Sequence, residues 1–143
     1  MGKQLNLFES NLNTGPRLKA AMREAVRKSP LSRELIADRM RQAALMDGLG
    51  GGRGSTISLA NLDAWCSETH PNLIPINLLT IFCKVTNCLD PFRVMVCPLG
   101  GTCVEAEDAK LLAWAKLEFQ ARSLARRKKK ILSEIEGAVD GQE

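Results

Sequence analysis

The chain has 143 residues, of which 45% are hydrophobic and 25% charged, and its net charge at pH 7 is +4. This length permits one compact domain with an appended element, and it excludes two full hydrophobic cores. No apolar run approaches the roughly 20 residues that span a bilayer, and the first residues lack the apolar core of a signal peptide, so we expect a cytoplasmic protein.

The first 13 residues (1–13) are polar, and we expect them to form a flexible arm. Within the arm, Gln4, Leu5, Leu7 and Phe8 belong to the sequence Gln-Leu-Asn-Leu-Phe. This sequence resembles the peptide by which bacterial replication proteins dock onto the sliding clamp, where Gln4 would hydrogen-bond at the rim of an apolar pocket. The alternative, which we favour, is that the apolar side chains fold back onto the domain.

A helical domain is expected over residues 14–100, and its first two helices are amphipathic. The first runs from about Pro16 to Lys28 and stops at Ser29 and Pro30. The second extends from Ser32, a predicted N-cap, to about residue 46. The side chains expected on one face of this second helix are Leu35, Ile36, Met40 and Ala44.

Residues 48–56 contain five glycines and are predicted to form a flexible turn between two helices. A phosphate-binding loop of the nucleotide-hydrolase type is excluded, because no strand precedes the glycines and no Gly-Lys-Ser/Thr follows them. The turn is longer than the three or four residues of a tight helix-turn-helix. Arg53 and the amides of Gly52 and Gly54 are the natural donors to a phosphate here.

Two further helices are predicted at residues 58–66 and 75–87. The first is expected to bury Leu59, Leu62 and Trp65, and the second is almost wholly apolar and should form the floor of the domain. The segment 92–97 is either a short strand or the end of a helix that begins at Asp90 and Pro91. The predicted fold class is therefore all-α, with four to five helices before the last one.

The last region, residues 101–143, is expected to contain one long helix from about Glu105 to Ile135. Its final residues, 137–143, are expected to be frayed. Apolar residues recur along it at spacings of three and four, which indicates about three coiled-coil heptads and a homodimer through residues 111–135. We call this row of positions the seam. It consists of Trp114, Leu117, Ala121, Leu124, Lys128, Ile131 and Ile135.

The residue types needed for catalysis or metal binding are scarce. The chain has one His and no paired carboxylates in a recognisable arrangement, so no general acid–base pair is visible and we do not expect an enzyme. The five cysteines form no Cys-x-x-Cys pair, and small buried thiols are the better interpretation than zinc ligands. We expect neither a metal nor a cofactor.

Three segments together resemble a small family of early-region proteins from Mu-like phages and prophages, which have a repressor-like helix-turn-helix. The segments are Leu31–Met40 (LSRELIADRM), Leu62–Glu68 (LDAWCSE) and Ile74–Cys83 (IPINLLTIFC). The resemblance covers roughly residues 30–100, and the helix order over residues 16–88 is similar to that of λ-repressor-type domains. It implies a DNA-binding domain in which the helix at 58–66 enters the major groove.

This resemblance implies which residues would face duplex DNA. Asn61 is the best candidate for reading a base, because its amide can pair bidentately with adenine; Ser58 would either face DNA or act only as an N-cap. Asp63 is expected to face away from phosphate. Since the presumed recognition helix has few cations, phosphate contacts from elsewhere would supply much of the affinity. The expected DNA-contacting residues are Arg39, Arg41, Arg53, Ser55, Thr56, Ser58, Asn61, Arg126, Arg127, Lys128, Lys129 and Lys130.

Two functions are compatible with these patterns. The first, which we favour, is a dimeric DNA-binding regulatory protein of phage or prophage origin, and the basic run near the C-terminus supports it. The second is a protein-interaction module that keeps a repressor-like fold and binds replication or transposition partners. The scarcity of Lys and Arg in the helix at 58–66 favours this second function.

Overall fold

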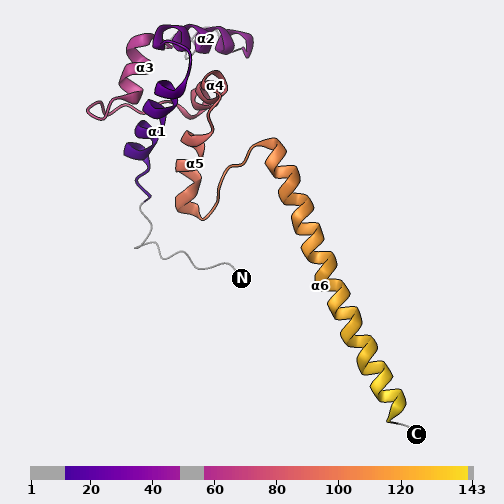
Figure 1. Cartoon of the computed structure of the whole chain (residues 1–143). Helices are drawn as coiled ribbons and strands as arrows, with labels where there is room; N and C mark the ends of the chain where they lie inside the picture. The colour runs from indigo at the N-terminus through magenta and orange to yellow at the C-terminus, as the bar shows by residue number, and fades with distance from the viewer. Residues whose placement is uncertain (1–11, 49–56, 142–143) are drawn as a thin grey trace. The chain divides into compact units, whose positions relative to one another are not determined.

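The computed structural model describes residues 12–48 and 57–141, and over these residues the chain is all-helical, as predicted. Residues 4–8, which carry the clamp-like sequence, lie outside the described part. The chain divides into two compact units, Met1–Cys103 and Val104–Glu143. The helices are α1 (Gly15–Lys28), α2 (Arg33–Met46), α3 (Leu59–Cys66), α4 (Ile76–Thr86), α5 (Asp90–Val96), the 3-10 helix η2 (Cys97–Leu99) and α6 (Ala106–Asp140), and Figure 1 labels α1 to α6.

The first two helices begin and end where local chemistry favours it. Pro16 occupies the first turn of α1, where its missing N–H costs nothing. Ser29, which precedes Pro30, is extended, and α1 therefore ends at Lys28. The Ser32 hydroxyl oxygen accepts a hydrogen bond from the N–H of Leu35 at 3.2 Å, which confirms Ser32 as the N-cap of α2.

The core of the first unit lies between α1, α2 and α4. α1 packs against α3 and α5, and α2 packs against α3 and α4. Met22, Met40 and Phe82 are completely buried at the centre of this core. α4 contributes more buried side chains than any other described helix, so it forms the floor of the domain as predicted. These side chains are Leu78, Leu79, Ile81, Phe82, Cys83 and Thr86.

Two predicted core positions are wrong. Leu35 is 39% exposed, because the inner face of α2 is formed by residues 36, 37, 40 and 44 and position 35 lies outside this arc. Leu59 is only half-buried, as the first residue of α3. Of the two alternatives for residues 92–97, a strand or the end of a helix, the structure shows the helix: α5 spans Asp90–Val96 with Pro91 at its start.

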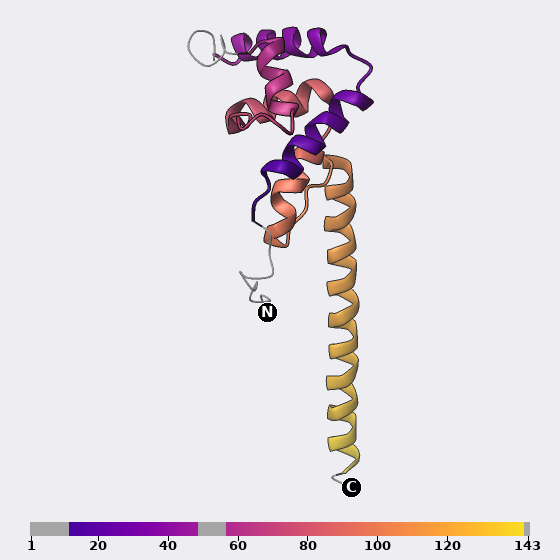
Figure 2. The same ribbon diagram turned by 90° about the vertical axis from the view of Figure 1, so that its left-hand side faces the viewer.

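The second unit is a single long helix. α6 has 35 residues and runs without a break (Figure 2). Its end at Asp140 shows that fraying from Gly137 onward is a wrong prediction, because one glycine costs only about 1 kcal/mol relative to alanine in a helix. Every described side chain of α6 is exposed, including those of Trp114, Leu117 and Ile135. No described helix has both the length and the apolar content that crossing a bilayer requires.

Candidate nucleic-acid interface

The N-terminus of α3 is fixed by two hydrogen bonds. The Ser58 hydroxyl oxygen accepts from the N–H of Asn61 at 3.1 Å, so Ser58 acts as the N-cap of α3. The side chain of Ile57 is buried in the core, and its carbonyl oxygen accepts from Nε of Arg41 at 3.1 Å. Arg41 therefore connects α2 to Ile57, two residues before the start of α3.

The C-terminus of α3 is held by two cations from α1. The ammonium group of Lys19 donates to the carbonyl oxygens of Ala64 at 2.9 Å and Trp65 at 3.3 Å. Nη1 of Arg23 donates to the carbonyl oxygen of Cys66 at 2.8 Å. These last carbonyls of the helix lack partners within it and carry the negative end of its dipole, so positive side chains stabilise them.

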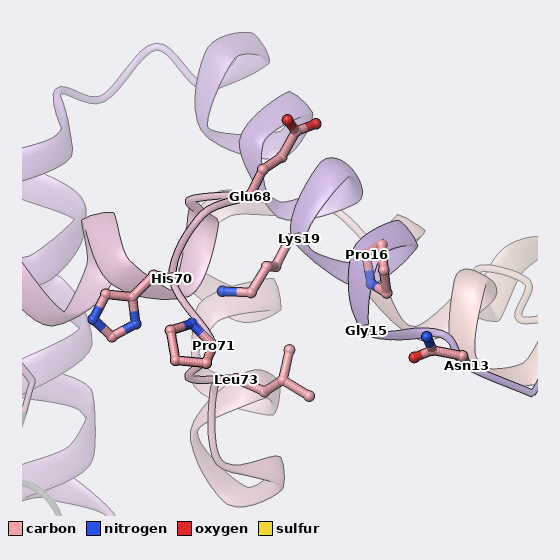
Figure 3. Close-up of a pocket in the computed structure, with 8 residues that line it drawn as sticks. All are labelled: Asn13, Gly15, Pro16, Lys19, Glu68, His70, Pro71 and Leu73. Carbon is pink, nitrogen blue, oxygen red and sulfur yellow. The ribbon is translucent and has the colours of Figure 1, made fainter.

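Lys19 also fixes the loop that follows α3. Its ammonium group donates to the carbonyl oxygen of Asn72 at 2.7 Å, and the residue is only 5% exposed. Figure 3 shows its side chain extending from α1 toward the loop that carries His70 and Pro71. Burial lowers the pKa of Lys19 from its ordinary value, and the neighbouring Cys66 opposes this shift.

A cavity of about 410 Å³ lies between the start of α1 and this loop (Figure 3). Its titratable side chains serve the fold. Lys19 donates to three carbonyls, Glu68 pairs with Arg23 at 3.0 Å, and Nδ1 of His70 accepts from the N–H of Asn72 at 3.2 Å. The cavity therefore brings Glu, His and Lys together as parts of the support for α3 and its loop.

The outer surface of α3 is small and acidic. Ala60 and Asp63 are its exposed residues, and α3 contains no Lys or Arg. The carboxylate of Asp63 accepts from Nη1 of Arg33 at 3.0 Å, so the cation nearest this surface is paired with an anion. Both side chains are about half-exposed, and the pair is accessible to solvent.

The structure separates the predicted DNA-contacting residues of the first unit. Arg41 and Ser58 lie together at the start of α3, but both make contacts that hold this helix. Asn61, on the same helix, is half-buried. Arg39 instead borders a cavity formed with Lys28 and the C-terminus of α4. The remaining three, Arg53, Ser55 and Thr56, lie outside the described residues.

The predicted basic residues of α6 are all exposed. Arg126, Lys129 and Lys130 follow Arg122 by four, seven and eight positions, so the four residues project from one side of the helix. We call these four residues the basic stripe. It lies opposite the seam, and Arg122 also pairs with Glu118 at 3.4 Å. A stripe of cations on one helix face is a surface that suits the phosphate backbone of a nucleic acid.

Sequence reasoning missed the importance of Lys19 and Arg23. A signal was present, because Lys19 lies between Leu18 and Met22 on the inner side of α1, where a cation needs a buried partner. Arg23 follows four positions later on the same side. The partners are backbone carbonyls more than 40 residues away, and no residue type in the sequence identifies them.

The described residues contain no group of three or more His, Cys, Asp or Glu side chains placed to bind a metal ion. The buried thiol of Cys66 has its pKa raised to about 11, because burial disfavours the thiolate. The two features with functional chemistry are therefore the supported helix α3 and the basic stripe of α6. Comparison of the chain with protein-family models, with curated proteins and with solved structures gives no match.

Proposed function

We propose that this chain is a non-enzymatic regulatory protein that binds duplex DNA, with a repressor-like helix-turn-helix in its first unit. The observation that carries the proposal is the basic stripe of α6, of which Arg126, Lys129 and Lys130 belong to a continuous run of five cations on an exposed helix. Electrostatic attraction between such cations and phosphates supplies essentially all of the affinity of non-specific binding. The stripe would therefore provide most of the affinity for DNA, and α3 would contact the base edges in the major groove.

The rigid support of α3 is consistent with a readout helix. A helix that inserts in the major groove must keep a fixed angle to the rest of its domain. Lys19, Arg23 and Arg41 hold both ends of α3, and Leu62 anchors its middle in the core. The phage or prophage origin that we propose is based on the resemblance of residues 30–100 to phage early-region proteins.

The test is the salt dependence of binding to a pool of random duplex DNA. We would compare the unaltered chain with a variant in which Arg122, Arg126 and Lys129 are each replaced by Gln. If the stripe contacts phosphates, the slope of log K against log salt should become less steep by about 2 to 3, since each lost contact removes about 0.9.

A control variant with the same loss of charge replaces Lys84, Lys110 and Lys116 by Gln. These exposed residues lie outside the stripe, and their replacement should leave the slope almost unchanged. Equal losses in both variants would show general electrostatic attraction without a defined surface. An unchanged slope in the stripe variant would contradict the proposal.

A second candidate function is a protein-interaction module that keeps this fold without using it on DNA. The ion pair of Asp63 with Arg33 on the outer surface of α3 favours it, because a carboxylate in the major groove would repel the flanking phosphates. Under this alternative the chain would retain no DNA from the random pool, even at low salt.

A further inference from the structure

We propose that α6 pairs with the α6 helix of a second copy of the chain, and that the two helices run antiparallel. The observation behind this is the seam, whose positions recur at spacings of three and four and whose five large apolar side chains are each more than half exposed on α6. This inference goes beyond the proposed DNA-binding function and applies to the chain without DNA. It concerns which residues meet across the pair.

The extension of α6 to Asp140 completes the seam. Ala138 follows Ile135 by three positions, so it continues the row of seam positions by one more. The seam then spans 25 residues from Trp114 to Ala138, about three and a half heptads and about 37 Å of helix. Three to four heptads are the length at which a two-stranded coiled coil becomes a credible assembly.

The sizes of the seam residues fit an antiparallel pair centred on residue 126. In this arrangement Trp114 meets Ala138 of the second copy, and Ala121 meets Ile131 of the second copy. These two layers thus pair a large side chain with a small one, which is how facing layers interdigitate at native packing density, while Leu117 faces Ile135 in a third layer. A parallel pair in register would instead place Trp114 on Trp114 and Ala121 on Ala121, which leaves one layer overfilled and another with a cavity.

Lys128 also favours the antiparallel direction. A parallel pair in register would place the two Lys128 side chains in the same layer, where their charges repel. In the antiparallel pair each Lys128 lies opposite Leu124 of the second copy. There its aliphatic stem can cover the leucine while the ammonium group reaches solvent.

Repulsion between like charges near the seam opposes the antiparallel pairing. Arg127 lies beside the two-fold axis of the antiparallel pair, close to Arg127 of the second copy, and the two Lys128 side chains lie in the layers on either side of this axis. All of these side chains are exposed on α6, where screening by solvent and salt weakens the repulsion. The basic stripe lies on the opposite side of each helix and stays exposed in the pair. Pairing and phosphate contact therefore use different faces of α6.

The direction can be read by photo-crosslinking of the full chain. We would replace Leu117 with a benzophenone derivative of phenylalanine, irradiate a mixture of isotopically light and heavy chains, and map the adducts between copies by mass spectrometry. The antiparallel pair predicts adducts near Ile135 of the second copy. Adducts centred on residue 117 of the second copy would overturn the antiparallel direction.

The strength of the pair tests the seam itself. Lys128→Leu places leucine against leucine in two layers, so the dissociation constant measured by sedimentation should fall by about tenfold or more. Lys129→Leu makes the same chemical change on the basic stripe and should leave it within about twofold. A chain that stays monomeric at high micromolar concentration in both variants would overturn the pairing, whether or not it binds DNA.

Discussion

The ammonium nitrogen of Lys19 lies 2.7 Å from the carbonyl oxygen of Asn72, and Lys19 is only 5% exposed. The same nitrogen lies 2.9 Å from the carbonyl oxygen of Ala64 near the end of α3. One side chain of α1 therefore joins the last turn of α3 to the loop that follows it. A buried cation is normally costly, and here the cost is offset by three carbonyl acceptors.

Replacement of Lys19 by Met should destabilise the first unit strongly. It keeps the length of the side chain but removes the ammonium donor from three carbonyl oxygens, of which, within the described residues, only that of Ala64 keeps another donor, the N–H of Ser67. We therefore expect the free energy of unfolding to fall by about 2–4 kcal/mol. Urea unfolding followed by circular dichroism would measure the change. Lys84→Met, at an exposed position of α4, is the matched control and should change stability by less than about 0.5 kcal/mol. Equal effects of the two replacements would contradict the role given to Lys19.

Asn87 should accept glycine and resist alanine. It follows α4 with φ of 52° and ψ of 45°, a left-handed conformation in which a Cβ atom is strained. We expect Asn87→Gly to keep or raise the stability, and Asn87→Ala to lower it by about 1 kcal/mol. Thermal unfolding of the two variants side by side would measure the difference. A more stable alanine variant would show that this left-handed turn does not limit the stability of the unit.

The buried thiols should make the first unit less stable at alkaline pH. Burial raises the pKa of Cys66 to about 11 and that of Cys83 to about 12, whereas a thiol in the unfolded chain has a pKa near 9.0. Between these values the unfolded chain has lost protons that the folded chain still binds. The stabilisation from each thiol is complete below about pH 9 and is lost as the pH rises toward 11 for Cys66 and toward 12 for Cys83, by an amount on the order of 1 kcal/mol per thiol.

The pH effect can be assigned to each thiol with alanine variants. Lys19 acts in the opposite direction, because its lowered pKa makes the folded state more stable as the pH rises toward 10.5. The difference between the unaltered chain and Cys66→Ala or Cys83→Ala isolates each thiol. Cys97→Ala, at an exposed thiol, is the control. If the three variants show the same loss of stability between pH 8 and pH 11, the thiols are not its cause.

Much of the fold could be predicted from the sequence because its signals are local. The N-caps Ser32 and Ser58, the prolines in the first turns and the 3.6-residue periodicity determine where helices start and which faces are buried. Periodicity failed for Leu35, which is apolar but lies just outside the inner arc of α2. It also failed at Gly137, where a weak breaker stands within a strong helix.

The candidate site was harder to predict because its contacts are not local. Arg41 was expected to contact phosphate, yet its Nε donates to the carbonyl of Ile57, 16 residues away. Residue types alone cannot separate a cation that binds a backbone carbonyl from one that faces a ligand. The accessible cations of α6 were easier to predict, because every described side chain of this single helix is exposed. The spacing of the cations along the helix alone defines the basic stripe.

Replacement of Asp63 by Asn distinguishes the two candidate functions. The ion pair with Arg33 is half-exposed and contributes less than about 1 kcal/mol, so the variant should remain folded. If α3 faces DNA, loss of the carboxylate and release of Arg33 should tighten binding to duplex DNA about three- to tenfold at low salt. Asp108→Asn removes the same charge from the first turn of α6 and should change binding by less than about twofold. If both variants bind DNA equally, α3 lies away from the duplex, and its surface is then free for the protein partner of the second candidate function.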